Sequence, residues 1–232
     1  MICTSACCRR AGTLPAILGV LALSVALLTT PACADVPGET GRLVELLNLG
    51  PGSVVADVGA GDGKWTEALA EVVGPEGHVF STEVESDLVD DLARRLERKN
   101  IENATAVLGS QSESGLPAAC CDAVLLRMVY HHFQQPRVMR ASLRRAIVPG
   151  GLVAIIDIQP QHNWRQLEGV PERGGHGIEL NDLVDEMTDD GFELVTRHDN
   201  WNDDEDRYCA VFRRPTELPE TPLSAESPAH RE

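Results

Sequence analysis

Apolar residues recur along residues 42–213 in two alternating patterns, one typical of buried strands and one of helices. Short, largely apolar runs predict strands at 54–57, 78–83, 104–108, 122–128, 152–158, 192–197 and 208–213. Apolar residues at helical spacing predict helices at 42–49, 64–73, 86–99, 136–147 and 180–190. Strands that alternate with helices indicate a parallel sheet covered on both faces.

The last two strands have no helix between them, which predicts an antiparallel hairpin at one edge of the sheet. The expected fold class is therefore α/β, with a seven-stranded, mostly parallel, doubly wound sheet and an antiparallel edge strand. Residues 35–41 read as a linker, and Pro149-Gly150-Gly151 reads as a break before the fifth strand. Ligands of such sheets bind beyond the carboxyl ends of the strands.

The first of these ends carries glycine at alternate positions, in Asp57-Val58-Gly59-Ala60-Gly61-Asp62-Gly63. A dinucleotide fingerprint needs its third glycine where Lys64 stands, and a phosphate-binding P-loop needs a hydroxyl where Trp65 stands. The stretch resembles, at every position, the acid-x-Gly-x-Gly-x-Gly turn of class I S-adenosylmethionine (SAM) dependent methyltransferases. A glycine-rich connection that binds no ligand is the plain alternative.

Residues 38–214 as a whole look like a class I SAM-dependent methyltransferase. The resemblance rests on the turn at 57–63, the acid Glu83, GLPAACCDAVLL at 115–126 and IVPGGLVAIID at 147–157. MVYHHF at 128–133 resembles a subgroup with a Tyr-His-His run. The family fold has seven strands with the last one reversed, which agrees with the pattern above.

The resemblance implies SAM as the cofactor. The turn would hold its methionine portion, Glu83 would bind the ribose hydroxyls, and Ser110 or Gln111 would replace the acid that many members place beside adenine. The cofactor-binding residues expected on this basis are Asp57, Gly59, Ala60, Gly61, Gly63, Glu83, Val84, Ser110, Gln111 and Arg127.

Methyl transfer from a sulfonium is an in-line displacement, so alignment and desolvation can supply most of the catalysis. A base is needed only where the acceptor arrives protonated. Tyr130, His131 and His132 follow the fourth strand and are the candidate catalytic residues. The alternative is that this run only packs beside the cofactor.

No metal site is expected from the sequence. Cys120-Cys121 and His131-His132 are adjacent pairs, a poor spacing for chelation, and the acidic run at 203–206 lacks the glycine of a calcium loop. The long loop at 159–179 holds Trp164, Arg165, Arg173 and His176. Its length and position suit a lid or a substrate-recognition element, and an irregular surface excursion is the alternative.

Charge narrows the choice of partner. The chain has a formal net charge of −16 and a pI near 4.8, which disfavours nucleic acid. The expected acceptor is therefore a small molecule, and no pattern in the sequence indicates an oligomeric state. Two other functions stay open: a SAM-fold binding or accessory protein without turnover, and a dinucleotide-dependent oxidoreductase, which the glycine spacing opposes.

The first 34 residues differ from the rest. Arg9 and Arg10 precede an apolar run at 14–28, and Ala32-Cys33-Ala34 suits signal-peptide cleavage. We expect a signal peptide at 1–34, the methyltransferase domain at 35–214 and a disordered tail at 215–232, with an exported mature protein. Contact with a membrane is expected only through the first segment. A retained anchor or a cytoplasmic protein with a mis-assigned start is the alternative, and SAM, a cofactor made inside cells, argues for it.

Overall fold

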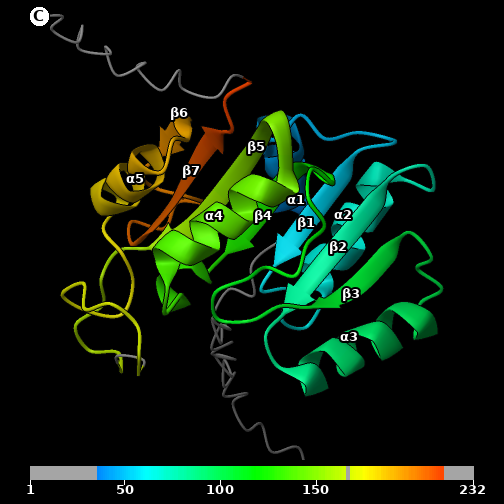
Figure 1. Ribbon diagram of the computed structural model, residues 1–232, viewed down its shortest axis with the longest axis horizontal. Helices are drawn as coiled ribbons and strands as arrows, with labels where there is room; N and C mark the ends of the chain where they lie inside the picture. Colours follow the sequence, from blue (N-terminus) through cyan, green and yellow to red (C-terminus); the bar gives the residue numbers. More distant parts are fainter. Residues whose placement is uncertain (1–35, 166–167, 217–232) are drawn as a thin grey trace, which may run out of the picture. The chain divides into compact units, whose positions relative to one another are not determined.

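A computed structural model of the chain describes residues 36–165 and 168–216. These residues form one seven-stranded sheet with helices on both of its faces (Figure 1). The strands are β1 (Val54–Val58), β2 (His78–Glu83), β3 (Ala104–Leu108), β4 (Cys121–Arg127), β5 (Ile147–Ile158), β6 (Glu193–His198) and β7 (Arg207–Arg213). The helices are α1 (Val36–Leu46), α2 (Lys64–Val73), α3 (Ser86–Arg98), the short 3₁₀ helix η1 (Tyr130–His132), α4 (Pro136–Ala146) and α5 (Leu180–Asp189).

The strand order is β3-β2-β1-β4-β5-β7-β6, and the first five of these strands pair in parallel. β7 runs antiparallel to both β5 and β6, so the last hairpin forms one edge of the sheet. The predicted fold class is thereby confirmed. β1 is central, since the chain turns to β2 on one side and to β4 on the other. This change of direction opens a crevice where ligands of doubly wound sheets bind.

Alternate residues of β1 face the two cores. Ala56 and Val58 pack toward α4 and α5, whereas Val55 packs toward α1 and α2. Figure 1 shows α4 in front of the sheet and α1 and α2 behind it. β5 is buried on both faces over residues 153–158, which agrees with its nearly unbroken apolar sequence.

The chain between 35 and 41 is not a linker, because α1 already begins at Val36. Pro37 is tolerated there, since the backbone N–H that proline lacks would be unpaired in the first turn of a helix. Glu39 suits the positive end of the helix dipole. Its buried carboxylate also accepts a hydrogen bond from Trp201 Nε1 at 2.5 Å, which ties α1 to the hairpin end of the sheet.

The glycine pair before the fifth predicted strand does not break the sheet. β5 begins at Ile147, which pairs with Cys121, and the pairing resumes after an irregular step at Leu152. Gly150 donates its N–H to the carbonyl of Arg214 at 2.8 Å, and Arg214 donates back to Gly151 at 2.9 Å. Backbone bonds to a distant residue therefore extend the strand through a sequence that favours a turn.

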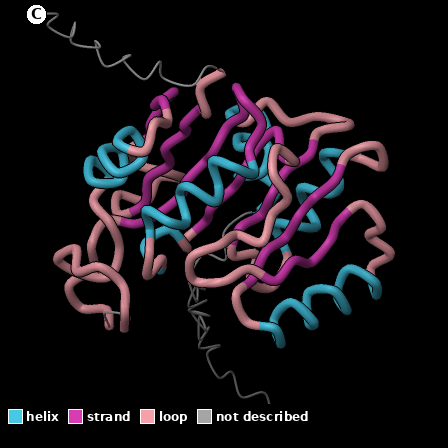
Figure 2. The backbone as a smooth tube through the Cα atoms, in the orientation of Figure 1, coloured by secondary structure: helices cyan, strands magenta, loops and turns pink. Residues whose placement is uncertain are grey.

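Most of the predicted signal peptide and tail lies outside the described residues, so the boundaries at 34 and 215 stay predictions. Within 36–165 and 168–216, none of the helices has the length and apolar character required to cross a membrane. Figure 2 shows the described residues between β5 and α5, 159–165 and 168–179, as loop.

Candidate functional site

A pocket of about 540 Å³ lies at the carboxyl ends of β1 to β4. Its volume falls within the range of about 300–1,000 Å³ that is usual for small-molecule sites. Its walls come from the turn after β1, the ends of β2 and β3, the segment after β4 and the long loop before α5. They include Val58, Gly59, Thr82, Glu83, Val84, Gly109, Ser110, Gln111, Met128, Val129, His132, Phe133, Glu168 and Val170.

The glycine turn is shaped by close packing and by its backbone conformation. A Cβ on Gly59 would lie 2.6 Å from Cγ2 of Val129, and a Cβ on Gly63 would lie 2.5 Å from Cδ1 of Leu92. Gly61 has open space around it, but its φ of 55° lies in the left-handed region that side chains disfavour. The turn therefore needs glycine at 59 and 63 for approach and at 61 for conformation.

Glu83 joins this turn to the end of β2. Its Oε1 accepts the backbone N–H of Gly61 at 2.6 Å, and its Oε2 accepts the N–H of Val84 at 3.3 Å. Each carboxylate oxygen has a second lone pair, so the side chain can still accept hydrogen bonds from a ligand. Glu83 and Val84 both line the pocket, as the sequence predicted.

Ser110 and Gln111 lie at the pocket wall beyond β3. The hydroxyl oxygen of Ser110 accepts the N–H of Glu113 at 3.0 Å and thereby holds its own turn. That hydroxyl keeps its hydrogen for donation, while the Gln111 side chain is exposed and can both donate and accept. Both residues can therefore contact a ligand in the pocket.

Asp57 serves the interior more than the pocket. It is 2% exposed, and its Oδ2 accepts from Thr66 Oγ1 at 2.8 Å, which in turn accepts from Ser81 Oγ. Burial raises the pKa of Asp57 to about 6, partly opposed by the hydrogen bond from Thr66. Direct contact with a cofactor, as the resemblance implied, therefore stays a prediction without support from this side-chain orientation.

Other predicted cofactor residues also lie outside the pocket walls. Ala60, Gly61 and Gly63 belong to the glycine turn but do not line the pocket. The side chain of Arg127 points toward α1. Its guanidinium donates to Glu39 at 3.4 Å and lies 5.4 Å from the ring of Trp65. This position favours a structural role for Arg127 over cofactor contact.

Tyr130 is completely buried and fully bonded. Its hydroxyl donates to Glu186 at 2.6 Å and accepts from Arg140 at 2.8 Å. Burial and the negative charge of Glu186 raise the pKa of this phenol well above its ordinary value. Tyr130 joins η1 to α4 and α5, which argues against the predicted catalytic role.

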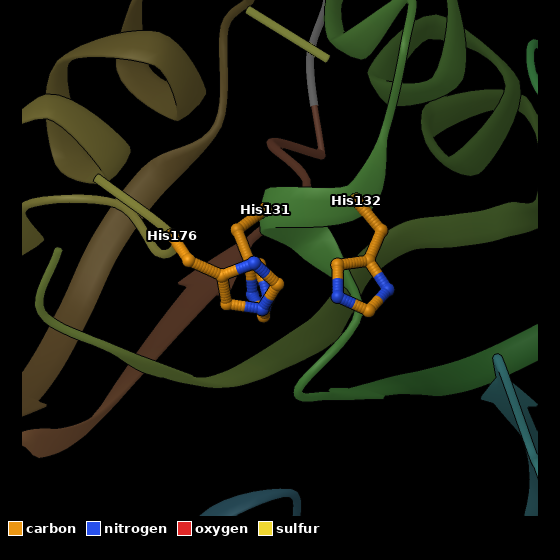
Figure 3. A group of neighbouring side chains, drawn as sticks. All are labelled: His131, His132 and His176. Carbon is orange, nitrogen blue, oxygen red and sulfur yellow. The ribbon is translucent and has the colours of Figure 1, made fainter. Parts of the chain in front are cut away.

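His131 and His132 differ in their surroundings, and the structure adds a third histidine to them (Figure 3). His131 is 3% exposed, and its Nδ1 lies 2.5 Å from Oδ1 of Asp157. His132 lines the pocket, and burial together with the neighbouring histidines lowers its pKa to about 4. His176 comes from the long loop, and its Nε2 lies 3.0 Å from Nε2 of His131.

The long loop at 159–179 is held at several points. Gln161 and His176 pair as an isolated backbone bridge, and Arg173 forms an ion pair with Glu186 of α5 at 2.5 Å. Glu168 and Val170 reach the pocket wall. These contacts favour a recognition element over an irregular excursion, and closure of the loop as a lid stays a prediction.

Sequence reasoning missed Asp157 and the meeting of His176 with His131. Asp157 ends the strand sequence IVPGGLVAIID, where a lone buried acid among apolar residues is the signal that was available. The expectation of no metal site rested on the adjacency of His131 and His132 in the chain. His176 is 45 residues from His131, so its arrival depends on the course of the loop.

Comparisons with known proteins agree with this fold. Residues 55–151 match a family model described as a methyltransferase domain. The chain is 32% identical over 145 residues to a protein-L-isoaspartate O-methyltransferase of Pyrococcus horikoshii, covering 62% of this chain and 61% of the relative. It is 24% identical over 126 residues to a demethylmenaquinone methyltransferase of Listeria welshimeri, covering 53% of each.

Among solved structures, a SAM-dependent methyltransferase from Aquifex aeolicus superimposes with a TM-score of 0.63 at 19% identity. The match covers 76% of this chain and 89% of that one. The chain spans between half and two thirds of the length of the two curated relatives above. These matches support the prediction of a methyltransferase for residues 55–151 and confirm the predicted fold. Residues 55–151 thus match a methyltransferase domain, and the chain has the fold of the SAM-dependent methyltransferase from Aquifex aeolicus.

Proposed function

We propose that the whole chain is an enzyme that transfers a methyl group from SAM to a small-molecule acceptor. The observation that carries the proposal is the position of Glu83. This acid lies at the end of β2, lines the pocket and is bonded to the glycine turn of β1. Such an acid can accept hydrogen bonds from two ribose hydroxyls, while the turn lets the backbone approach the ligand.

The residues present fit the cofactor. Glu83 would bind the ribose, Gly59 would leave room for the adjoining part of the cofactor, and Ser110 or Gln111 would contact the adenine. When bound, SAM supplies an electrophilic methyl group on a sulfonium that is already a good leaving group. The work left to the chain is to align the acceptor and to exclude water from it.

His132 is the remaining candidate base at the pocket wall. Its lowered pKa, about 4, keeps it neutral at pH 7 and able to accept a proton, but makes it a weak base. Alignment therefore contributes more than proton transfer in this proposal, and an acceptor atom with a free lone pair and no proton to lose before attack suits the site best.

The acceptor is proposed to be a small molecule for two reasons. A net charge of −16 disfavours nucleic acid, and His132 and Phe133, which follow β4, offer the acceptor only a small part of the wall of the same pocket. The similar proteins are named for protein L-isoaspartate and for demethylmenaquinone, which differ too much to choose one acceptor for this chain.

Calorimetry with SAM, with its demethylated product and with NAD tests the cofactor, and a labelled-methyl screen over metabolite pools tests turnover. We expect binding of the first two ligands, none of NAD, and a labelled product. Glu83→Ala should weaken cofactor binding, while Glu76→Ala, which changes an exposed acid at the opposite end of β2, should leave it unchanged. Binding without any labelled product would favour the alternative, a SAM-fold accessory protein.

We also propose export of the mature chain, with cleavage after Ala34. Support comes from the paired arginines, the short apolar run and Ala32-Cys33-Ala34. N-terminal sequencing of protein from fractionated cells tests this proposal. A start at Asp35 in the envelope or medium is expected, whereas Met1 in the soluble cytoplasmic fraction would contradict it and favour an intracellular enzyme.

A further inference from the structure

Three histidines from two separate segments meet beside the pocket. His131 and His132 belong to η1, and His176 belongs to the loop before α5. A nitrogen of each ring lies within 4.8 Å of a nitrogen of the other two. Figure 3 shows the rings of His131 and His176 overlapping and the ring of His132 beside them. Imidazole nitrogens so close together are suited to bind one metal ion.

The surroundings of His131 determine which of its nitrogens carries hydrogen. Its Nδ1 lies 2.5 Å from Oδ1 of Asp157, a side chain with no exposed surface. The same carboxylate accepts the backbone N–H groups of His131 at 3.2 Å and of Ile158 at 2.9 Å. Both oxygens of this carboxylate already act as acceptors, so Nδ1 of His131 donates to Oδ1. With the ring hydrogen at Nδ1, the lone pair of the imidazole lies at Nε2.

His176 has the same arrangement with a different partner. Its Nδ1 lies 3.0 Å from the backbone carbonyl oxygen of Arg165. A carbonyl oxygen can only accept, so Nδ1 of His176 carries the hydrogen and its Nε2 also bears a lone pair. The two Nε2 atoms face each other at 3.0 Å. Two lone pairs at that distance repel, and only a shared cation, either a proton or a metal ion, turns the contact into an attraction.

We propose that the cation is a divalent transition-metal ion of the zinc class, bound by His131, His132 and His176. A shared proton would involve two rings only, whereas the third imidazole lies within reach of both. Histidine ligands of zinc regularly donate their second N–H to a carboxylate or a backbone carbonyl, as His131 and His176 do here. Zn–N bonds of about 2.0–2.1 Å require the two Nε2 atoms to move apart by only about 0.3 Å.

The site goes beyond the proposed methyl transfer, and binding of the ion does not depend on it. Three protein ligands are the number found in zinc sites that keep a fourth position for water or substrate. His132 belongs both to this group and to the pocket wall, so the ion would lie at the edge of the pocket. An oxygen or sulfur atom of a small molecule is the chemical class that such a position takes.

Metal titration of the full chain tests the inference. Protein freed of metal by a chelator is titrated with Zn²⁺ by calorimetry and with Co²⁺ by visible absorption, at pH 7.5. We expect His176→Ala and His132→Ala each to remove one equivalent of tight binding or to weaken it at least tenfold. His162→Ala, from the same loop but outside the group, is the matched control and should leave the titration unchanged.

Cysteine thiols elsewhere in the chain bind Zn²⁺ in every variant alike, so the site is defined by the equivalent that depends on His176. Asp157→Asn should weaken that equivalent about 10- to 100-fold, because it changes the partner of a ligand and not the ligand itself. His176→Gln and circular dichroism guard against loss of fold. An identical Zn²⁺ titration for wild type, His176→Ala and His176→Gln would overturn the inference, as would the absence of tight binding in the wild type.

Discussion

The backbone N–H of Gly61 donates to Oε1 of Glu83 across 2.6 Å, and this bond joins the glycine turn after β1 to the end of β2. The same carboxylate therefore shapes the turn and faces the pocket. A change at Glu83 acts on the site in two ways, through the lost ligand contact and through a turn that is less well fixed.

Glu83→Ala should weaken SAM binding by about 1.5–3 kcal/mol, the usual value of hydrogen bonds to a charged acceptor. That loss corresponds to roughly ten- to a hundredfold in Kd. Glu83→Gln should lose less, because the amide oxygen still accepts the N–H of Gly61. Calorimetry measures both variants, with Glu76→Ala as the control. Equal affinity in wild type and Glu83→Ala would remove Glu83 from the site.

The glycines of the turn should differ in their tolerance of alanine. Gly61→Ala meets open space and should lower the free energy of unfolding by about 1–2 kcal/mol through its left-handed φ alone. Gly59→Ala should cost more, because its Cβ would also lie 2.6 Å from Val129 Cγ2. Urea denaturation of the two variants gives the comparison.

A second change tests the cause of the difference. Val129→Ala removes Cγ2, the atom that lies 2.6 Å from a Cβ at position 59, and leaves only its own Cβ at 3.0 Å, so the double variant Gly59→Ala, Val129→Ala should be more stable than the sum of the single changes predicts. Strict additivity would show that the backbone conformation, and not the contact with Val129, makes glycine necessary at 59.

Local signals explain why so much of the sheet could be predicted. The run Val54-Val55-Ala56 and the glycines after it specify a buried strand and a turn through neighbouring residues alone, and β1 and α2 lie where that pattern placed them. The start of α1 and of β5 could not be found in this way. Each depends on a distant partner, Trp201 for Glu39 and Arg214 for the Gly150-Gly151 pair.

The residues of the site also divide into those that local sequence signals predict and those that depend on distant contacts. Glu83, Ser110 and Gln111 follow strands of a parallel sheet, so their strand positions alone bring them to one edge. His176 lies in a loop with no periodicity, and contacts such as the bridge to Gln161 and the ion pair of Arg173 bring it to His131. Burial, which decides against Tyr130 as a catalytic residue, also comes from packing across three helices.

Asp57 should make stability depend on pH. Burial raises its folded pKa from 3.8 to about 6, so the folded state binds the proton more tightly than the unfolded state. The stabilisation that protonated Asp57 gives the folded state is complete below about pH 4, and it is lost as the pH rises through about 6. The size of the loss is at most about 3 kcal/mol, at 1.36 kcal/mol for each pKa unit.

Asp57→Asn removes this ionisation and keeps an oxygen that accepts from Thr66. Relative to wild type, the variant should therefore gain stability between pH 4 and pH 7, measured by urea denaturation at several pH values. Thr66→Val is a useful companion, because it takes away the bond that favours the ionised form and should enlarge the pH effect. A stability difference between wild type and Asp57→Asn that does not vary with pH would contradict the raised pKa.

Tyr130 provides the test that separates structure from catalysis beside the pocket. Tyr130→Phe deletes a hydroxyl bonded to Glu186 and Arg140, while these two keep their own ion pair at 2.6 Å. Both lost partners are charged, so the free energy of unfolding should fall by about 1.5–3 kcal/mol. SAM affinity and methyl transfer should stay within about twofold of wild type at a temperature where the variant is folded.

Tyr208→Phe, which loses one bond to the carbonyl of Ile178, is the matched control and should lower the free energy of unfolding by less, about 1 kcal/mol. Loss of methyl transfer in Tyr130→Phe with unchanged stability would show that Tyr130 is a catalytic residue, as the sequence predicted.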